Sequence, residues 1–158
     1  MNSNYAGFWL RLVAVIIDGI VIGCIQSLVF VPLLAAVGFG IASNMESMDM
    51  QDSGDIMGMV GVIVAALSAY WVLAMCIQIL YFSLMESSKF QGTLGKMALG
   101  IKVTDMNGAK LDFVKAFIRN LCKIISNFTL LIGYIMAGFT EKKQALHDMI
   151  ASTLVVKK

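Results

Sequence analysis

The sequence is poor in charge and in proline. Of its 158 residues, 14% are charged, one is proline and 59% are hydrophobic. Average soluble domains are roughly 45–50% apolar and about 25% charged. The high apolar content excludes a disordered chain. The net charge of +2 lacks the clustered excess that nucleic-acid binding needs, and three cysteines are too few for a secreted disulfide scaffold. The composition is typical of a membrane protein.

Positive charge is absent from half of the chain. No Lys or Arg occurs among the 77 positions 12–88, whereas eleven of the twelve basic residues lie between Lys89 and Lys158. Residues 43–57 carry four acidic residues and no basic one. Short cytoplasmic loops of membrane proteins collect Lys and Arg. The pattern therefore predicts a membrane protein of several spans with a cytoplasmic N-terminus.

Two apolar runs are long enough to cross a bilayer. The first, 8–42, is too long for a signal peptide and has no A-x-A-like cleavage site. A helix of that length measures roughly 50 Å, against about 30 Å of hydrocarbon, so it must tilt, break or emerge, and we expect a break at Pro32. The second span is predicted at 56–85. The acidic loop 43–55 between them is then external, and the basic segment 86–115 is cytoplasmic.

A third helical segment is predicted at 116–140, with two interpretations. Its apolar stretch of about sixteen residues is near the lower limit for a crossing. A full crossing would place the lysine-bearing tail, 141–158, outside the cell. A helix–turn–helix that re-enters the cytoplasmic leaflet keeps the tail inside, and we favour this arrangement.

Short strand signals flank this third segment. Residues 101–104 alternate in polarity and are followed by Asn107-Gly108, a hairpin signal, and the tail 152–156 also has strand character. Pairing between these segments requires that they lie on one side of the membrane. Asp112 is expected to cap the helix that follows. The predicted fold is an all-α membrane protein, a single domain over 1–158. It has two full transmembrane helices, a re-entrant or spanning third segment, a small cytoplasmic β-hairpin and a tail strand.

Several motifs resemble those of a known family. The run Tyr5–Arg11 followed by Asp18, then Gly92-Thr93-Leu94-Gly95-Lys96 and Leu146-His147-Asp148, resembles the RDD family of small bacterial membrane proteins. The family is named for one Arg and two Asp, which correspond to Arg11, Asp18 and Asp148. Transport, including sodium/proton antiport, has been proposed for the family. The resemblance therefore implies an ion- or proton-binding site at these three residues, in a protein of the bacterial inner (plasma) membrane.

Asp18 carries the strongest functional signal within the chain itself. An acid at the centre of a membrane helix costs about 2.5–3.5 kcal/mol on insertion scales, so Asp18 needs a partner, a proton or a cation. Exchange of a proton for a cation and a structural ion pair both satisfy this need. Arg11 lies two helical turns from Asp18, so direct contact would need extended side chains. Arg11 is interpreted either as a residue that reaches the lipid headgroups and orients the helix or as a partner of Asp148.

Two further features bear on assembly and proton movement. Gly19 and Gly23 form a small-x-x-x-small face that suits close helix packing. Since two spans and a re-entrant segment do not enclose an ion path, transport would require a homo-oligomer or another membrane protein. His147, the only histidine, is interpreted either as a proton relay beside Asp148 or as a surface residue.

Other motifs argue against catalysis and cofactors. Gly95-Lys96 lacks the Ser or Thr of a phosphate loop and is expected at the membrane surface, and no nucleophile triad or zinc motif is recognisable. We expect the cysteines to be buried apolar residues. The Met-rich loop at 45–50 suits copper(I), but a solvated loop is the simpler interpretation.

The sequence thus predicts a non-enzyme without metal or cofactor. Cation/proton transport by the protein, or by an assembly that contains it, is the favoured function, and a non-transporting scaffold or accessory protein is the alternative. The expected partners are the lipid bilayer, a monovalent cation or proton, and a second copy or another membrane protein, with no nucleic acid.

Overall fold

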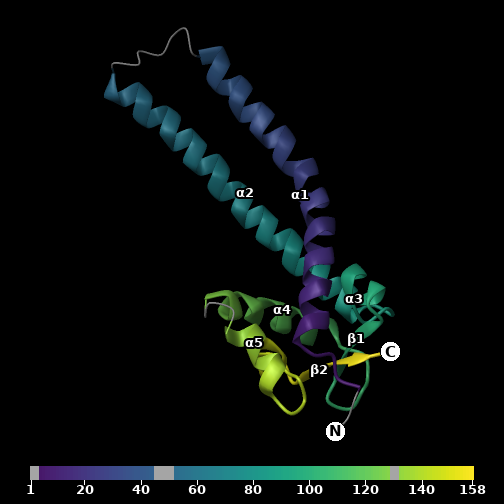
Figure 1. Ribbon diagram of the computed structural model, residues 1–158. Helices are drawn as coiled ribbons and strands as arrows, with labels where there is room; N and C mark the ends of the chain where they lie inside the picture. Colours follow the sequence, from purple (N-terminus) through teal and green to yellow (C-terminus); the bar gives the residue numbers. More distant parts are fainter. Residues whose placement is uncertain (1–3, 45–51, 129–131) are drawn as a thin grey trace. The chain divides into compact units, whose positions relative to one another are not determined.

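The computed structural model describes residues 4–44, 52–128 and 132–158. Its elements in chain order are α1 (Phe8–Asn44), α2 (Ser53–Ser87), α3 (Leu94–Ala98), β1 (Ile101–Asp105), α4 (Phe113–Phe128), α5 (Ile132–Phe139), α6 (Leu146–Ile150) and β2 (Thr153–Lys157) (Figure 1). The chain divides into two compact units, Ile22–Ile77 and Met1–Val21 together with Gln78–Lys158.

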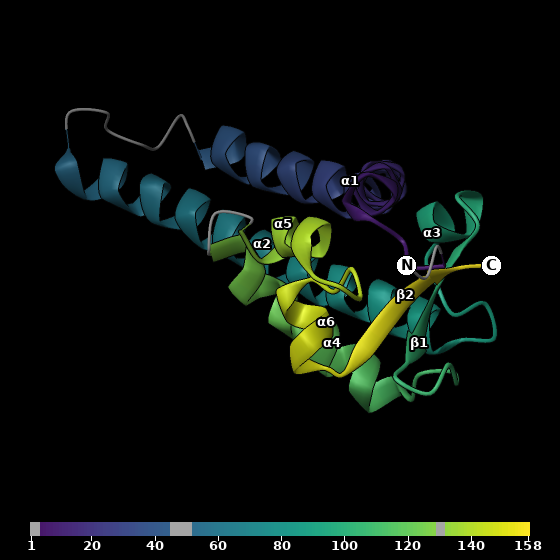
Figure 2. The ribbon, with the colours of Figure 1, turned by 60° about the horizontal axis from the view of Figure 1, so that its bottom comes forward.

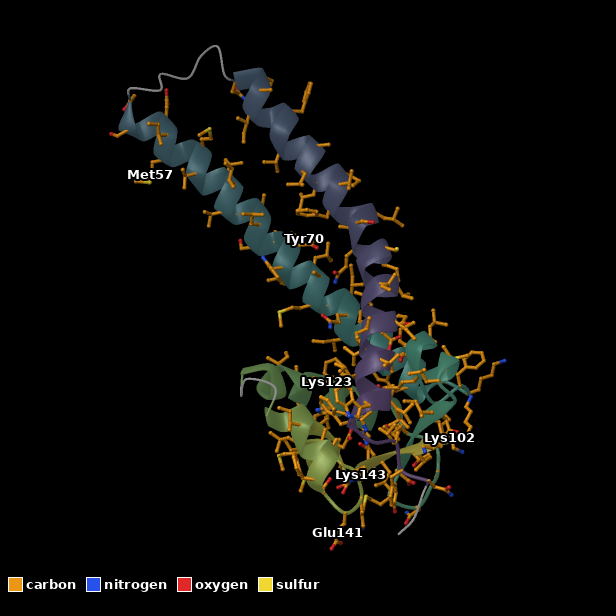
Figure 3. The ribbon with its side chains drawn as sticks, viewed as in Figure 1. Met57, Tyr70, Lys102, Lys123, Glu141 and Lys143 are labelled. Atoms are coloured by element: carbon orange, nitrogen blue, oxygen red, sulfur yellow. The ribbon has the colours of Figure 1, made fainter. Side chains whose placement is uncertain are left out.

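The unit Ile22–Ile77 consists of the facing parts of α1 and α2. The side-chain amide of Gln26 donates a hydrogen bond to the carbonyl oxygen of Ala74, 3.1 Å away. The rings of Phe30 and Tyr70 pack with their centroids 4.4 Å apart (Tyr70 is labelled in Figure 3). These contacts join the two helices as an antiparallel pair.

Both long helices have the length and apolarity of membrane spans. α1 has 37 residues and α2 has 35, and few of their side chains are buried inside the protein. Trp9 is 74% exposed and Phe39 78%. A water-soluble protein rarely leaves so much apolar surface uncovered, and a bilayer covers it. The two predicted spans are therefore confirmed as long apolar helices.

The expected break at Pro32 is wrong. α1 continues through Pro32 without interruption from Phe8 to Asn44. Membrane helices tolerate proline because local adjustments and neighbouring groups satisfy the backbone carbonyl that loses its donor. The excess length of the helix is therefore not removed by a break at this residue.

A small sheet joins the two ends of the chain. β1 pairs with β2 in antiparallel register, with Val103 opposite Val155 (Figure 2). Tyr5 forms a further bridge to Val156, and the backbone N–H of Ala6 donates to the carbonyl oxygen of Val155 at 2.9 Å. The N-terminal segment, β1 and the tail strand therefore lie together, on one side of the membrane.

The predicted β-hairpin is wrong, although its turn exists. The N–H of Gly108 donates to the carbonyl oxygen of Asp105 at 3.2 Å, and the φ angle of Gly108 is +81°, which favours glycine. After the turn the chain enters α4 instead of returning as a strand, and the tail strand β2 takes the place beside β1. The predicted strand in the tail is confirmed.

The third helical segment consists of two shorter helices, α4 and α5. α4 has 16 residues, or about 24 Å, which is shorter than the hydrocarbon core. Among the described residues only α1 and α2 have the length of a span. The predicted N-cap of α4 is confirmed, because a carboxylate oxygen of Asp112 accepts a hydrogen bond from the N–H of Val114 at 3.1 Å.

The core of the larger unit is small and partly polar. Its apolar part comes from the N-terminal segment, α1, the two strands, the loop before α4 and α4 itself: Ala6, Ala14, Ile101, Val103, Leu111, Ala116 and Val155. Beside this cluster lie fully buried carboxylates and cations from both long helices and from the later helices. These buried charges are the candidate functional site.

Candidate functional site

Asp18 is completely buried and accepts hydrogen bonds from three neutral donors. Its carboxylate accepts a hydrogen bond from the Thr93 hydroxyl, with the two oxygens 2.5 Å apart, and one from the backbone N–H of Gly95 at 2.8 Å. The Tyr81 hydroxyl is more distant, at 3.4 Å. Thr93 and Gly95 lie at the start of α3, so Asp18 acts as the cap of a helix 75 residues later in the chain.

Gly95 makes this approach possible. A β-carbon at Gly95 would lie 2.2 Å from the carbonyl oxygen of Ala14, one turn before Asp18 in α1. No side chain fits there without displacement of the backbone of one helix. The glycine therefore lets the N-terminus of α3 reach the carboxylate, and the close packing fixes where α3 sits against α1.

Arg11 and Asp148 form an ion pair between α1 and α6. The Arg11 guanidinium also donates to the carbonyl oxygens of Ala6 at 2.9 Å and Lys143 at 2.5 Å. Asp148 is fully buried, and its carboxylate also accepts the backbone N–H of Ala145 at 3.1 Å, which caps α6. This pair fastens the start of α1 to the segment that precedes the tail strand.

A third fully buried carboxylate, Glu86 near the end of α2, contacts three basic side chains. It contacts Arg119 Nη1 at 2.6 Å, Lys96 Nζ at 2.5 Å and Lys123 Nζ at 3.7 Å. Arg119 also donates from Nε to Asp148 at 2.8 Å, so its guanidinium bridges the two carboxylates. We call the connected residues the ion-pair cluster: Arg11, Glu86, Lys96, Arg119, Lys123 and Asp148.

An amide and an aromatic ring lie beside these ion pairs of Glu86. The amide nitrogen of Asn120 donates to Glu86 at 3.1 Å and to the Ala116 carbonyl oxygen at 2.8 Å. Lys123 lies over the ring of Phe82, 4.0 Å from its centroid (Lys123 is labelled on α4 in Figure 3). Four cations thus surround two carboxylates in a space with little access to water.

Burial and the attraction between opposite charges set the pKa values of Asp148 and Arg119. Burial alone would raise the pKa of Asp148, but Arg119 and Arg11 outweigh it and hold the pKa far below its usual value. Burial alone would lower the pKa of Arg119, but Glu86 and Asp148 together raise it. This pair of charges is therefore permanent at physiological pH.

The lysines of the cluster behave differently. Burial lowers the pKa of Lys123 to about 7, since the attraction of Glu86 is partly cancelled by repulsion from Lys96 and Arg119. Burial also lowers the pKa of Lys96, although Glu86 opposes the change. The ammonium of Lys123 therefore titrates close to physiological pH, whereas Arg119 and Asp148 keep their charges.

Most of the chain matches a known family of proteins. A family model described as "RDD family" matches residues 5–152. The chain belongs to the RDD family. An uncharacterized protein of Bacillus subtilis, YxaI, is 33% identical over 153 residues, 97% of both chains. The uncharacterized membrane protein YteJ of the same species is 32% identical over 99% of this chain and 83% of its own. No solved structure matches.

The structure divides the three RDD residues between two places. Arg11 and Asp148 are in direct contact, whereas Asp18, also on α1, contacts the start of α3. No ion pair joins Asp18 to a Lys or Arg within the described part of the chain. The three residues therefore do not form a single binding site in this structure.

His147 is buried, so the predicted surface position is wrong. It is 3% exposed, and its Nε2 lies 3.6 Å from Asp148. Burial lowers the pKa of His147 far below its usual value, despite the attraction of Asp148. The imidazole is therefore neutral at physiological pH, which does not favour a proton relay at this residue.

Other predicted positions differ from the structure. Lys96 is buried against Glu86, so its expected place at the membrane surface is wrong. Cys24 and Cys76 are exposed, because two helices alone leave most of their side chains facing outward. A β-carbon at Gly19 or Gly23 would meet nothing within 4 Å, so the described helices do not use this face for packing. The Met-rich loop lies outside the described residues.

Sequence reasoning missed the four residues that complete the ion-pair cluster: Glu86, Lys96, Arg119 and Lys123. Two signals were available. Glu86 is the only acidic residue between Asp55 and Asp105, and it lies at the end of an apolar run. Arg119 and Lys123 are four residues apart and so share one face of a helix. Neither signal identifies the partner, because the contacts join distant parts of the chain.

Proposed function

We propose that this RDD protein is a non-transporting, non-catalytic membrane scaffold or accessory protein. In this proposal the RDD residues fasten the later helices and the sheet to the start of α1, and Glu86 fastens them to the end of α2. The observation that carries it is that both RDD aspartates are fully buried and occupied by donors from later segments. Each acid connects a membrane helix to a short helix that it caps.

Asp148 supports a structural role most directly. Two guanidinium groups and one backbone N–H occupy its carboxylate. Its lowered pKa keeps it ionised, so it does not take up a proton in the physiological range. An exchange site must gain and lose its ion, and a carboxylate held between two arginines is poorly suited to that task.

Asp18 also fits a structural role, because the backbone N–H of Gly95 donates a hydrogen bond to it. A carboxylate is stabilised at the start of a helix by exposed N–H groups and by the helix dipole. The Gly95 N–H and the Thr93 hydroxyl supply such donors at 2.8 and 2.5 Å. With these donors Asp18 is satisfied without a bound cation.

Cation/proton exchange at Asp18 is the second candidate function, and one observation favours it. Asp18 is a buried acid whose described partners are all uncharged, so it has no fixed counter-ion in the described part of the chain. Protonation or a monovalent cation would supply the missing charge. Transport would then require a homo-oligomer or another membrane protein around α1.

Reconstitution distinguishes the two functions. Purified protein in vesicles that contain a pH dye is exposed to a gradient of Na⁺ or K⁺. We expect proton flux equal to that of empty vesicles for the wild type and for Asp18→Asn. Asp112→Asn is the matched control, because Asp112 caps an exposed helix end. Flux that Asp18→Asn abolishes and Asp112→Asn preserves, with both variants folded, would reject the scaffold proposal in favour of exchange.

A further inference from the structure

The first three turns of α4 have their polar and apolar sides reversed relative to a helix on a soluble protein. Arg119 and Asn120 on this helix are 1% and 3% exposed, and both contact Glu86. A helix on the surface of a soluble protein buries its apolar stripe and exposes its charges. The charged side of α4 instead faces the ion-pair cluster.

The outward side of α4 is apolar. Its large side chains are exposed: Phe113 39%, Val114 59%, Phe117 37%, Ile118 44% and Leu121 45%. The rings of Phe113 and Phe117 lie together, with their centroids 6.2 Å apart. These five residues form one continuous stripe, which we call the outer face of α4, and each of them keeps more than a third of its surface exposed.

The polar side of α4 contacts α2 close to the end of a membrane span, so the whole helix, with its outer face, lies near that end. Asn120 and Arg119 bind Glu86, and the Asn120 amide also lies 3.4 Å from the Ser83 hydroxyl. In the same stretch of α2, Leu80 and Leu84 are exposed, 47% and 57%. The exposed apolar side chains of α2 therefore lie within about one helical turn of Ser83 and Glu86, the residues of α2 that α4 contacts.

The length of α4 and the basic charge beside its outer face match the interface between lipid and water. At about 24 Å, α4 is too short to span a bilayer, but it suits a position along the surface. Lys115 on α4 is exposed beside the apolar stripe. Long basic side chains reach anionic headgroups while apolar neighbours enter the acyl region.

We propose that α4 lies in the interface of the membrane leaflet on the side of the two chain termini, with its outer face among the acyl chains. The ion-pair cluster then forms the protein side of this helix and the lipid forms the other. Helices of this kind sit about 5–10 Å into the headgroup and acyl boundary. This placement is independent of whether Asp18 exchanges ions.

Spin labels test the placement in the full-length protein. The three native cysteines are replaced by alanine, and a nitroxide is attached to a single cysteine at Val114 or, separately, at Ile118. Both residues belong to the outer face. A label at Lys110 in the exposed loop before α4 is the matched control. The protein is reconstituted in vesicles of phosphatidylethanolamine and phosphatidylglycerol, and collisions with oxygen and with a water-soluble nickel chelate are measured.

Labels at Val114 and Ile118 should collide several-fold more often with oxygen than with the nickel chelate, and the label at Lys110 should show the reverse preference. A nickel preference at both α4 positions would show that the outer face is in water. Low collision rates with both reagents would show that a second copy or another protein covers it. Either result would overturn the proposal, and two label positions guard against a folding defect at one of them.

Discussion

Replacement of Asp148 by asparagine tests the ion-pair cluster at its most connected acid. The carboxylate pairs with Arg11 and Arg119 and caps α6 through the Ala145 N–H. Asp148→Asn keeps the shape and one acceptor oxygen but removes the charge between two buried guanidinium groups. Glu86 then remains as the only carboxylate beside four cations in the cluster.

The expected loss of stability is large for a single polar substitution. Removal of one partner from a buried ion pair costs about 3–5 kcal/mol, because the other charge is left uncompensated. With about 2–4 °C of melting temperature per kcal/mol for a chain of this size, we expect a decrease on the order of 10 °C. Thermal unfolding in detergent, followed by tryptophan fluorescence, measures the shift.

Two further variants make the test specific. Asp112→Asn carries the same chemical change at an exposed helix cap, where Asn and Asp act about equally, so its melting temperature should stay near that of the wild type. Arg11→Gln combined with Asp148→Asn should be less destabilised than the sum of the single changes, since the two residues are in contact. A shift for Asp148→Asn as small as the control, or additive effects in the double variant, would refute the structural role of this pair.

Two other predictions follow from close packing and from burial. Gly95→Ala should lower the melting temperature, because the new methyl group would lie 2.2 Å from the Ala14 carbonyl oxygen, whereas Gly61→Ala, where a methyl group meets nothing within 4 Å, should not. Equal melting temperatures for the two variants would contradict the contact. The ammonium of Lys123 should titrate at about pH 7, against about 10.4 for an ordinary lysine, in NMR spectra of the ¹³C-methylated protein assigned with Lys123→Arg. Because the folded protein releases this proton at lower pH than the unfolded chain, Lys123 should make stability rise with pH between these two values. A titration near pH 10 would show that the side chain is hydrated.

The sequence predicts the membrane helices and the tail strand for clear physical reasons. Runs without charge over more than twenty residues have few alternatives to a spanning helix, and the absence of basic residues from 12–88 marks the same region. The tail was recognisable as a strand, and its need for a partner indicated β1. The cap at Asp112 followed from local chemistry alone.

The arrangement of the buried charges could not be predicted in the same way. Asp18 contacts residues more than 70 positions away, and Glu86 selects its cations from α3 and α4. Which acid meets which base depends on how the helices pack, and charge counting does not determine it. The burial of His147 has the same origin, since the contacts of Asp148 draw α6 into the core.

Hydrogen exchange over residues 94–98 measures whether Asp18 is the fixed cap of α3. The Gly95 N–H donates to Asp18, so we expect slow exchange in this segment, equal in Na⁺ and in choline buffers. Asp18→Ala should accelerate exchange there, while β1, whose backbone bonds to β2, stays protected. Exchange that changes with Na⁺ in the wild type, or protection that survives Asp18→Ala, would show that Asp18 is not a fixed cap of α3.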